Sequence, residues 1–324
     1  MSADSNDKPS HTFPPRSTNT RTNSKLLKIV GTASLAIIGV YIACVVLTDV
    51  AARNRSFTRL SMTWQRNWPF ARGQYAPLRL APILLATGLV RPARVELEPR
   101  ISLLLNPFDV IDNAVLATGS HDPDVWEWTK SHLVPGGTII DVGAHIGIFT
   151  LQGAKAVGEN GKVIAVEPNP VTVARLRDNI SASGWHNIIV EPVACADTAG
   201  TMKLFLGSKI NAGTASLSRE GALHHAAVGD SVDVQVIPLD NIVQRAGLTR
   251  IDVIKVDTEG AEVVVLKGAR TSIAKFRPVI IVEAMDPQLR DMGTSLAALE
   301  SLLREYGYTK ARADSDNQEW VPAR

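Results

Sequence analysis

The sequence predicts an α/β fold in which parallel strands alternate with helices. The apolar run from Thr138 to Asp141 reads as a strand, and a glycine-rich turn and a helix follow it. A second apolar run, Val163 to Val166, ends at Glu167, after which Asn169 and Pro170 form the usual start of another helix. Because strand, helix, strand and helix alternate, we expect parallel strands joined by right-handed crossovers.

The remaining elements continue this pattern. A helix is expected from Asp122-Pro123 up to the stop at Pro135-Gly136-Gly137. Further strands of the main sheet are expected at Asn187 to Val193, Ile251 to Val256 and Pro278 to Val282, and helices at Glu259 to Gly268 and around Leu296 to Leu303. An inserted antiparallel pair is expected at Thr201 to Leu206 and Ser231 to Ile237, and two final antiparallel strands around Tyr308 and Trp320.

Length and composition favour one principal core. The chain has 324 residues, which fits an α/β unit of about 200 residues with extra segments. Its 34 basic and 32 acidic residues give no overall electrostatic reason to expect a nucleic-acid partner. Two cysteines, Cys44 and Cys195, are too few for a disulfide framework or a zinc cluster, and no metal site is predicted.

The N-terminal part predicts a membrane anchor. Residues 1–24 are polar and are expected to form a disordered tail. Residues 25–49 are predicted to form a transmembrane helix, because Ile29 to Leu47 is an uncharged stretch of 19 residues that spans roughly 30 Å as a helix. A cleaved signal peptide and a buried core helix are the alternatives, but the stretch is long for a signal and no matching cleavage site follows.

Residues 50–104 are predicted to be a basic and aromatic juxtamembrane and adaptor segment. Between Arg53 and Arg72 there are five arginines and no acid, with Trp64 and Trp68 among them. Such a composition suits an anionic membrane surface, with a solvated basic linker as the alternative. Basic residues are balanced on both sides of the apolar stretch, so the charge rule leaves its orientation open.

The turn after the first strand indicates a nucleoside-type cofactor. In DVGAHIG the spacing of Asp141, Gly143 and Gly147 differs from the G-x-G-x-x-G of dinucleotide binders. The Asp141 carboxylate would repel a phosphate but suits the cationic amino acid portion of S-adenosylmethionine. Glu167, 26 residues on, is placed to accept hydrogen bonds from both ribose hydroxyls. His145 in the same turn is expected to be packed or solvated.

A second acidic motif lies in IDVIKVDTEGAEVVVLKGA. Asp257 and Glu259 follow the predicted strand Ile251 to Val256, and the carboxyl ends of parallel strands form the ligand crevice. We therefore expect both side chains to face it. The alternatives are that Glu259 caps the helix and that Glu262 pairs with a surface cation.

These motifs, together with AVEPNP and RPVIIVEA in this order, resemble those of the FkbM family of S-adenosylmethionine-dependent methyltransferases. The resemblance covers roughly residues 105–310, and residues 105–324 are expected to form the methyltransferase domain. It implies a class I methyltransferase (Rossmann-like) fold, a seven-stranded, mostly parallel sheet with helices on both faces. It also implies O-methylation, often of a sugar hydroxyl or a polyketide-type product.

Site residues follow from the resemblance position by position. It implies that Asp141, Gly143, Ala144 and Gly147 form the cofactor turn, that Glu167 binds the ribose, and that Asp197 lies near the adenine. Asp257 and Glu259 match the family's central acidic motif, and we expect one of them to act as a base on the acceptor hydroxyl or to orient it. His145 departs from the family pattern, which has asparagine there.

The expected function is that of a membrane-anchored O-methyltransferase whose catalytic domain faces the cytoplasm. The acceptor is expected to be a small molecule or a lipid-linked saccharide, since tethering raises effective concentration at the membrane. A methyltransferase with a soluble acceptor, an inactive membrane scaffold with the same fold, and a nicotinamide oxidoreductase are the alternatives. The polar loop Gly207 to Asp230 is expected to cover the crevice as a lid or acceptor surface, or to be a solvated loop.

Overall fold

The computed structural model describes residues 92–106, 109–206, 215–218 and 230–323. The predicted tail, the predicted transmembrane helix and most of segment 50–104 lie outside these ranges, as does most of the loop from Gly207 to Asp230. Within the described ranges, no helix combines the length and the hydropathy needed to cross a bilayer.

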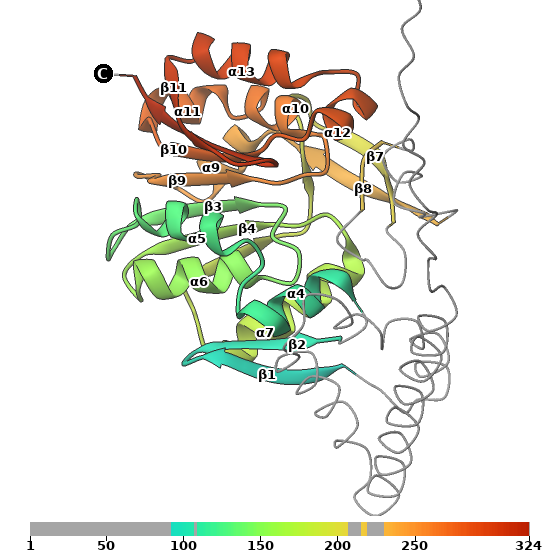
Figure 1. Ribbon diagram of the computed structural model, residues 1–324, viewed down its shortest axis with the longest axis vertical. Helices are drawn as coiled ribbons and strands as arrows, with labels where there is room; N and C mark the ends of the chain where they lie inside the picture. Colours follow the sequence, from blue (N-terminus) through green and yellow to red (C-terminus); the bar gives the residue numbers. More distant parts are fainter. Residues whose placement is uncertain (1–91, 107–108, 207–214, 219–229, 324) are drawn as a thin grey trace, which may run out of the picture. The chain divides into compact units, whose positions relative to one another are not determined.

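A seven-stranded sheet forms the centre of the described unit (Figure 1). Its strands run in the order β11-β12-β10-β9-β3-β4-β5. They are β3 (Thr138–Val142), β4 (Lys162–Val166), β5 (Ile188–Glu191), β9 (Val253–Val256), β10 (Val279–Glu283), β11 (Tyr308–Ala313) and β12 (Asn317–Pro322). Only β12 runs against its neighbours, so six of these strands are parallel. This confirms the predicted class I sheet and its two final antiparallel strands.

Helices cover both faces of the sheet, because neighbouring residues of each parallel strand point to opposite sides. Ile139 packs into one cluster of buried residues and Ile140 into the other. The Ile139 side contains residues of α4 (Val110–Thr118), α5 (Pro123–Lys130) and α6 (Ile148–Val157); the Ile140 side contains those of α9 (Leu239–Arg245), α10 (Glu262–Lys267), α11 (Arg270–Phe276), α12 (Asp286–Asp291) and α13 (Leu296–Glu305). The central strands are therefore apolar on both sides, and polar groups concentrate at their ends.

An N-terminal hairpin joins this core. Strands β1 (Ala93–Glu98) and β2 (Ile101–Leu105) pair antiparallel, and alternate residues of β2 are fully buried. Helix α7 (Pro170–Ser183) fastens the hairpin to the sheet: the Asn179 side chain accepts a bond from the Leu104 N–H (2.7 Å) and donates one to the Ile146 carbonyl (2.9 Å). All of these strand residues except Leu105 belong to the predicted adaptor segment 50–104, and the structure packs them against the methyltransferase unit.

A small three-stranded sheet stands beside the main one. Strands β7 (Gly200–Phe205) and β8 (Ser231–Ile237) pair antiparallel, as predicted, and β6 (Ala194–Cys195) adds to β8 in parallel. Ser216, in the described stretch 215–218, forms a bridge with Phe205. The inserted strands thus bring residues 215–218 toward the loops at the carboxyl ends of the main strands.

Candidate functional site

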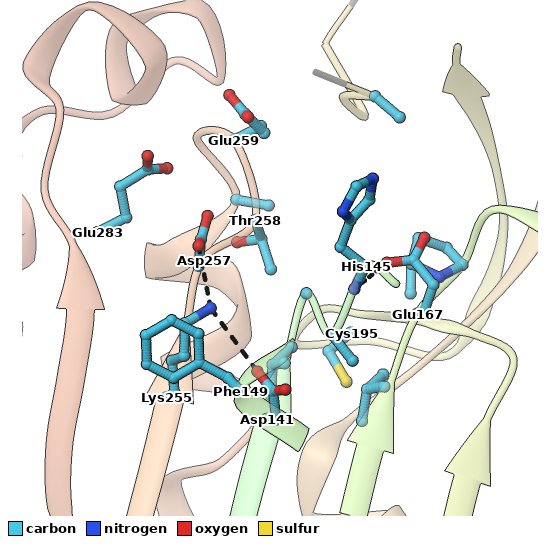
Figure 2. Close-up of a pocket in the computed structure, with 18 of the residues that line it drawn as sticks. Asp141, His145, Phe149, Glu167, Cys195, Lys255, Asp257, Thr258, Glu259 and Glu283 are labelled. Atoms are coloured by element: carbon cyan, nitrogen blue, oxygen red, sulfur yellow. Dashed lines mark hydrogen bonds and ion pairs between the residues drawn. The ribbon is translucent and has the colours of Figure 1, made fainter. Parts of the chain in front are cut away.

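A pocket opens at the carboxyl ends of β3, β4 and β9 (Figure 2). From β3 the chain proceeds to β4 and β5 on one side, whereas β9 and β10 lie on the other, so the strand order reverses between β3 and β9. Ligands of open α/β sheets bind at such reversal points.

The glycine turn after β3 forms the base of the pocket. Gly143 has φ +85°, and a Cβ at this position would lie 1.7 Å from the Asp257 carbonyl oxygen. The N–H groups of Gly143 and Ala144 both donate to the Val166 carbonyl, at 3.0 Å each. Glycine is therefore required at residue 143 because the end of β9 approaches the turn so closely. At Gly147, φ is +96° and a Cβ would lie 2.5 Å from the Leu176 side chain.

Glu167 lies directly after β4 and lines the pocket. One carboxylate oxygen accepts the His145 N–H at 2.9 Å, and the other accepts the Asn169 N–H at 2.9 Å. These bonds fix the carboxylate, and each oxygen keeps a lone pair for a further donor. Burial raises the pKa of Glu167 to about 7, although both backbone bonds oppose the rise.

A buried lysine joins two aspartates at the centre of the pocket. Lys255 Nζ lies 2.9 Å from Asp257 Oδ2 and 3.6 Å from Asp141 Oδ1, while Thr150 donates to the other Asp141 oxygen at 2.7 Å (Figure 2). Burial raises the pKa of Asp141. Burial acts in the same direction on Asp257, but the charge and hydrogen bond of Lys255 outweigh it and lower the pKa of Asp257. Asp257 therefore stays ionised.

The turn after β9 holds Glu259 in an unusual backbone conformation. Glu259 has φ +53° and is followed by Gly260 at +106°. The Glu262 carboxylate supports this turn by accepting the Thr258 N–H and hydroxyl, both at 2.9 Å, and the Gly260 N–H at 3.2 Å. Glu262 is 1% exposed, so the idea that it pairs with a surface cation was wrong, and Glu259 does not cap α10, whose N-cap is Ala261.

Two further carboxyl groups face the pocket and form no ion pair within the described ranges. Glu259 Oε2 accepts the Gln288 amide at 2.5 Å, and Glu283, at the end of β10, has a buried oxygen, Oε2, with no hydrogen-bond partner among the described residues. Burial and the neighbouring Asp257 raise the pKa of Glu259 to about 8. Burial and the charges of Asp257, Glu259 and Glu262 raise the pKa of Glu283 well above its ordinary value, although the charge of Lys255 opposes the rise.

His145 contributes an imidazole to the same space. Its φ is +48°, and its Nε2 is buried without a hydrogen-bond partner in the part of the chain that the structure describes. The ring lies between Glu167 and the turn that carries Thr258 and Glu259 (Figure 2). Burial lowers the pKa of His145 to about 4, so the ring is neutral at physiological pH.

Most of the predicted site residues meet in this pocket. The lining includes Asp141, Gly143, Ala144, Glu167, Asp257 and Glu259. Gly147 is not a lining residue but begins α6 in the same turn. Asp197 is exposed and outside the lining, where Val193, Ala194 and Cys195 stand instead. The chain lines the pocket at β6, which ends at Cys195, and Asp197 comes two residues after that strand.

Lys255 and Glu283 were not predicted as site residues. A signal for Lys255 was present, because a lysine in an otherwise apolar strand, two residues before Asp257, shares a strand face with that acid and needs a buried partner. Glu283 ends a predicted parallel strand, as Glu167 follows another. In the described ranges, no three histidine, cysteine, aspartate or glutamate side chains are grouped to hold a metal ion.

Comparisons with known proteins agree with this geometry. The family model of the methyltransferase FkbM domain matches residues 141–310. The methyltransferase sdnD of Sordaria araneosa is 28% identical over 57% of this chain and 77% of its own length. The 31-O-demethyl-FK506 methyltransferase FkbM of Streptomyces tacrolimicus is 26% identical over 55% of this chain and 74% of its own. The hexuronic acid methyltransferase AglP of Haloferax volcanii is 32% identical over 44% of this chain and 53% of its own.

The pocket suits S-adenosylmethionine. Glu167 presents a fixed carboxylate to the pocket, and Asp141 stands below α6 where a dinucleotide would need room for phosphate. Carboxyl groups outnumber cations among the described lining residues, and opposite charge favours the cofactor's sulfonium and ammonium groups. With a family model that matches more than half of its length, this chain belongs to the FkbM family of S-adenosylmethionine-dependent methyltransferases.

Proposed function

We propose that the protein transfers a methyl group from S-adenosylmethionine to a hydroxyl oxygen of a sugar, a glycolipid or a related natural product. The observation that carries the proposal is the acidic turn of Asp257 and Glu259, which faces the pocket beside the cofactor turn. The names of two relatives, an O-demethyl-FK506 methyltransferase and a hexuronic acid methyltransferase, support an oxygen-rich acceptor.

We assign cofactor contacts to the β3 and β4 ends. The Glu167 carboxylate is placed to accept the ribose hydroxyls, and the Gly143 and Ala144 backbone forms the surface over which the cofactor lies. Asp141 acts through Lys255: its carboxylate is fully buried and holds that cation against Asp257. The bound cofactor supplies an already activated methyl group, so alignment of the acceptor oxygen is the protein's main task.

Asp257 and Glu259 divide the work on the acceptor. Asp257 is kept ionised by Lys255, so it is a weak base and is suited to orient the hydroxyl by accepting its hydrogen bond. Glu259, whose pKa is raised to about 8, is the stronger base once it is ionised. We therefore propose that the proton of the hydroxyl passes to Glu259. The alternative is that Asp257 takes the proton and Glu259 orients the hydroxyl.

Isotope transfer tests this proposal. Full-length protein, tritiated S-adenosylmethionine and an extract rich in glycosides and glycolipids should give label that resists base hydrolysis, as an ether does. Glu259→Gln and Asp257→Asn should each lower transfer by about 10² to 10⁴-fold, with cofactor binding retained in calorimetry. An Asp257→Asn protein with full turnover would remove Asp257 from this role. Label in carboxyl esters or on nitrogen would contradict O-methylation, and cofactor binding without any transfer would favour the inactive scaffold.

We also propose that residues 25–49 anchor the enzyme in a membrane with the catalytic domain in the cytoplasm, where the cofactor is available. The uncharged stretch Ile29 to Leu47 and the arginines from Arg53 to Arg72 support this. The full-length protein should remain with membranes after carbonate extraction, and external protease should not reach the catalytic domain in intact cells. Release by carbonate would contradict the anchor.

A further inference from the structure

Some buried polar atoms on the acceptor side of the pocket have no hydrogen-bond partner among the residues that the structure describes. They are Glu283 Oε2, Gln288 Oε1 and His145 Nε2. Glu283 and His145 line the pocket, while Gln288 stands behind Glu259 and donates to it. Buried polar atoms are costly when they stay unpaired, so this wall is suited to a ligand with hydroxyl groups, which can donate to one atom and accept from another.

Among the described residues, the same wall offers no unpaired lysine or arginine to an anionic ligand. Lys255 is the single lysine or arginine among the lining residues that the structure describes, and both Asp141 and Asp257 already contact its ammonium group. Glu259 and Glu283 carry no ion pair within the described ranges, and His145 is neutral. A carboxylate or phosphate placed here would lie beside Asp257, Glu259 and Glu283, and the one lysine of the described lining is already paired.

The titration of the two glutamates is consistent with this arrangement. Burial raises the pKa of Glu259 and Glu283, and the charges of Asp257 and Glu262 raise both further. The surroundings therefore disfavour a negative charge on either glutamate. The same electrostatic field acts on the charge of a ligand. An ammonium group would experience the opposite effect.

We propose, on the basis of the function above, that the acceptor is a polyhydroxylated ring compound, neutral or amino-substituted, with no acidic group beside the reacting hydroxyl. Its hydroxyl groups donate to Glu283 and to the His145 ring, and the reacting oxygen faces Asp257 and Glu259. This acceptor class differs from the one in the name of the Haloferax volcanii relative, whose acceptor is a hexuronic acid.

Three glycosides test the inference, a neutral one and two charged analogues that each differ from it at one substituent. They are methyl β-D-glucopyranoside, its 2-amino-2-deoxy analogue, and methyl β-D-glucuronide. Binding to the full-length protein with S-adenosylhomocysteine is followed by saturation-transfer NMR, and transfer is followed with tritiated S-adenosylmethionine. The glucoside and the amino sugar should bind and accept label, and the glucuronide should do so about tenfold less well, the equivalent of one pKa unit.

Two variants show whether Glu283 is responsible. Glu283→Gln keeps the shape of the side chain and removes its ability to ionise. In the wild type, the preference for the glucoside over the glucuronide should increase with pH as Glu283 loses its proton, and in Glu283→Gln this increase should be smaller. Asp233→Asn, on the exposed face of β8 and paired with Lys203, should leave the ratio unchanged.

Opposite results separate this inference from the proposed function. Equal or better binding of the glucuronide to the wild-type protein would overturn the inference, even if a hydroxyl of that sugar is methylated and O-methyl transfer stands. Absence of binding by all three glycosides would also overturn it. Label found on nitrogen or in esters would instead overturn the proposed function.

Discussion

Replacement of Lys255 by methionine removes the cation that Asp141 and Asp257 share. The side chain of Lys255 is 6% exposed and that of Asp141 is fully buried, so water cannot take over the role of the ammonium group at Asp141, whereas the Asp257 side chain is 26% exposed. Methionine has a similar length but no charge, so it also removes the cation–π contact of the Lys255 ammonium group, which lies 4.8 Å from the centre of the Phe149 ring. The variant therefore isolates the charge.

The expected loss of stability is large. Removal of one partner of a buried ion pair costs about 3–5 kcal/mol, because the remaining charge is left without compensation. For a domain of this size, a loss of 1 kcal/mol lowers Tm by about 2–4 °C, so we expect a decrease of roughly 6–20 °C. The double variant Lys255→Met, Asp257→Asn should be more stable than the single variant, because one of the two uncompensated charges is gone.

The pH dependence gives an independent check. Without Lys255, burial raises the folded-state pKa of Asp257 and Asp141 above their unfolded values, so the variant is stabilised where these groups are protonated. Its deficit against the wild type should be small near pH 5 and grow toward pH 8. Urea unfolding followed by circular dichroism at both pH values measures this. A deficit below about 1 kcal/mol that does not change with pH would refute the role of Lys255.

Two further predictions concern the turns of the pocket. Gly143→Ala should destabilise the fold by well over the roughly 1–2 kcal/mol of left-handed strain alone, because its Cβ would lie 1.7 Å from the Asp257 carbonyl oxygen. The control is Gly184→Ala, which has a positive φ but open space around it and should cost only the strain. Equal effects of the two variants in thermal unfolding would contradict this explanation. The rate of methyl transfer should rise with pH through a limb at or below about pH 8, because Glu259 must lose its proton to act as a base and a cationic cofactor lowers its pKa. The Glu259→Gln enzyme should lack this limb, and an unchanged pH profile would exclude Glu259 as the base.

The sheet and the acidic residues that follow β4 and β9 could be predicted, together with Asp141, because they depend on local patterns. An apolar run that ends in an acid and is followed by a glycine turn or a capped helix fixes both the strand and the direction of its last side chain. Asp141 and Glu167 were found in this way, and the structure places both in the pocket. The acids after β9 were found for the same reason.

The remainder depends on contacts that the local pattern does not contain. Asp197 follows a strand, but that strand, β6, pairs with β8 outside the main sheet, so the chain turns away from the pocket before Asp197. The hairpin of β1 and β2 is held by Asn179, more than 70 residues away in the sequence. The carboxyl group of Glu283 reaches the pocket only because β10 lies beside β9.

Calorimetric titration of S-adenosylmethionine into three full-length proteins tests the central claim most directly. The proteins are the wild type, Glu167→Ala and Asp197→Ala. Loss of two hydrogen bonds to a charged group costs about 3 kcal/mol or more, so Glu167→Ala should bind at least about a hundredfold more weakly, whereas Asp197→Ala should bind like the wild type. Wild-type affinity in a folded Glu167→Ala protein, or loss of binding in Asp197→Ala, would contradict the pocket described above.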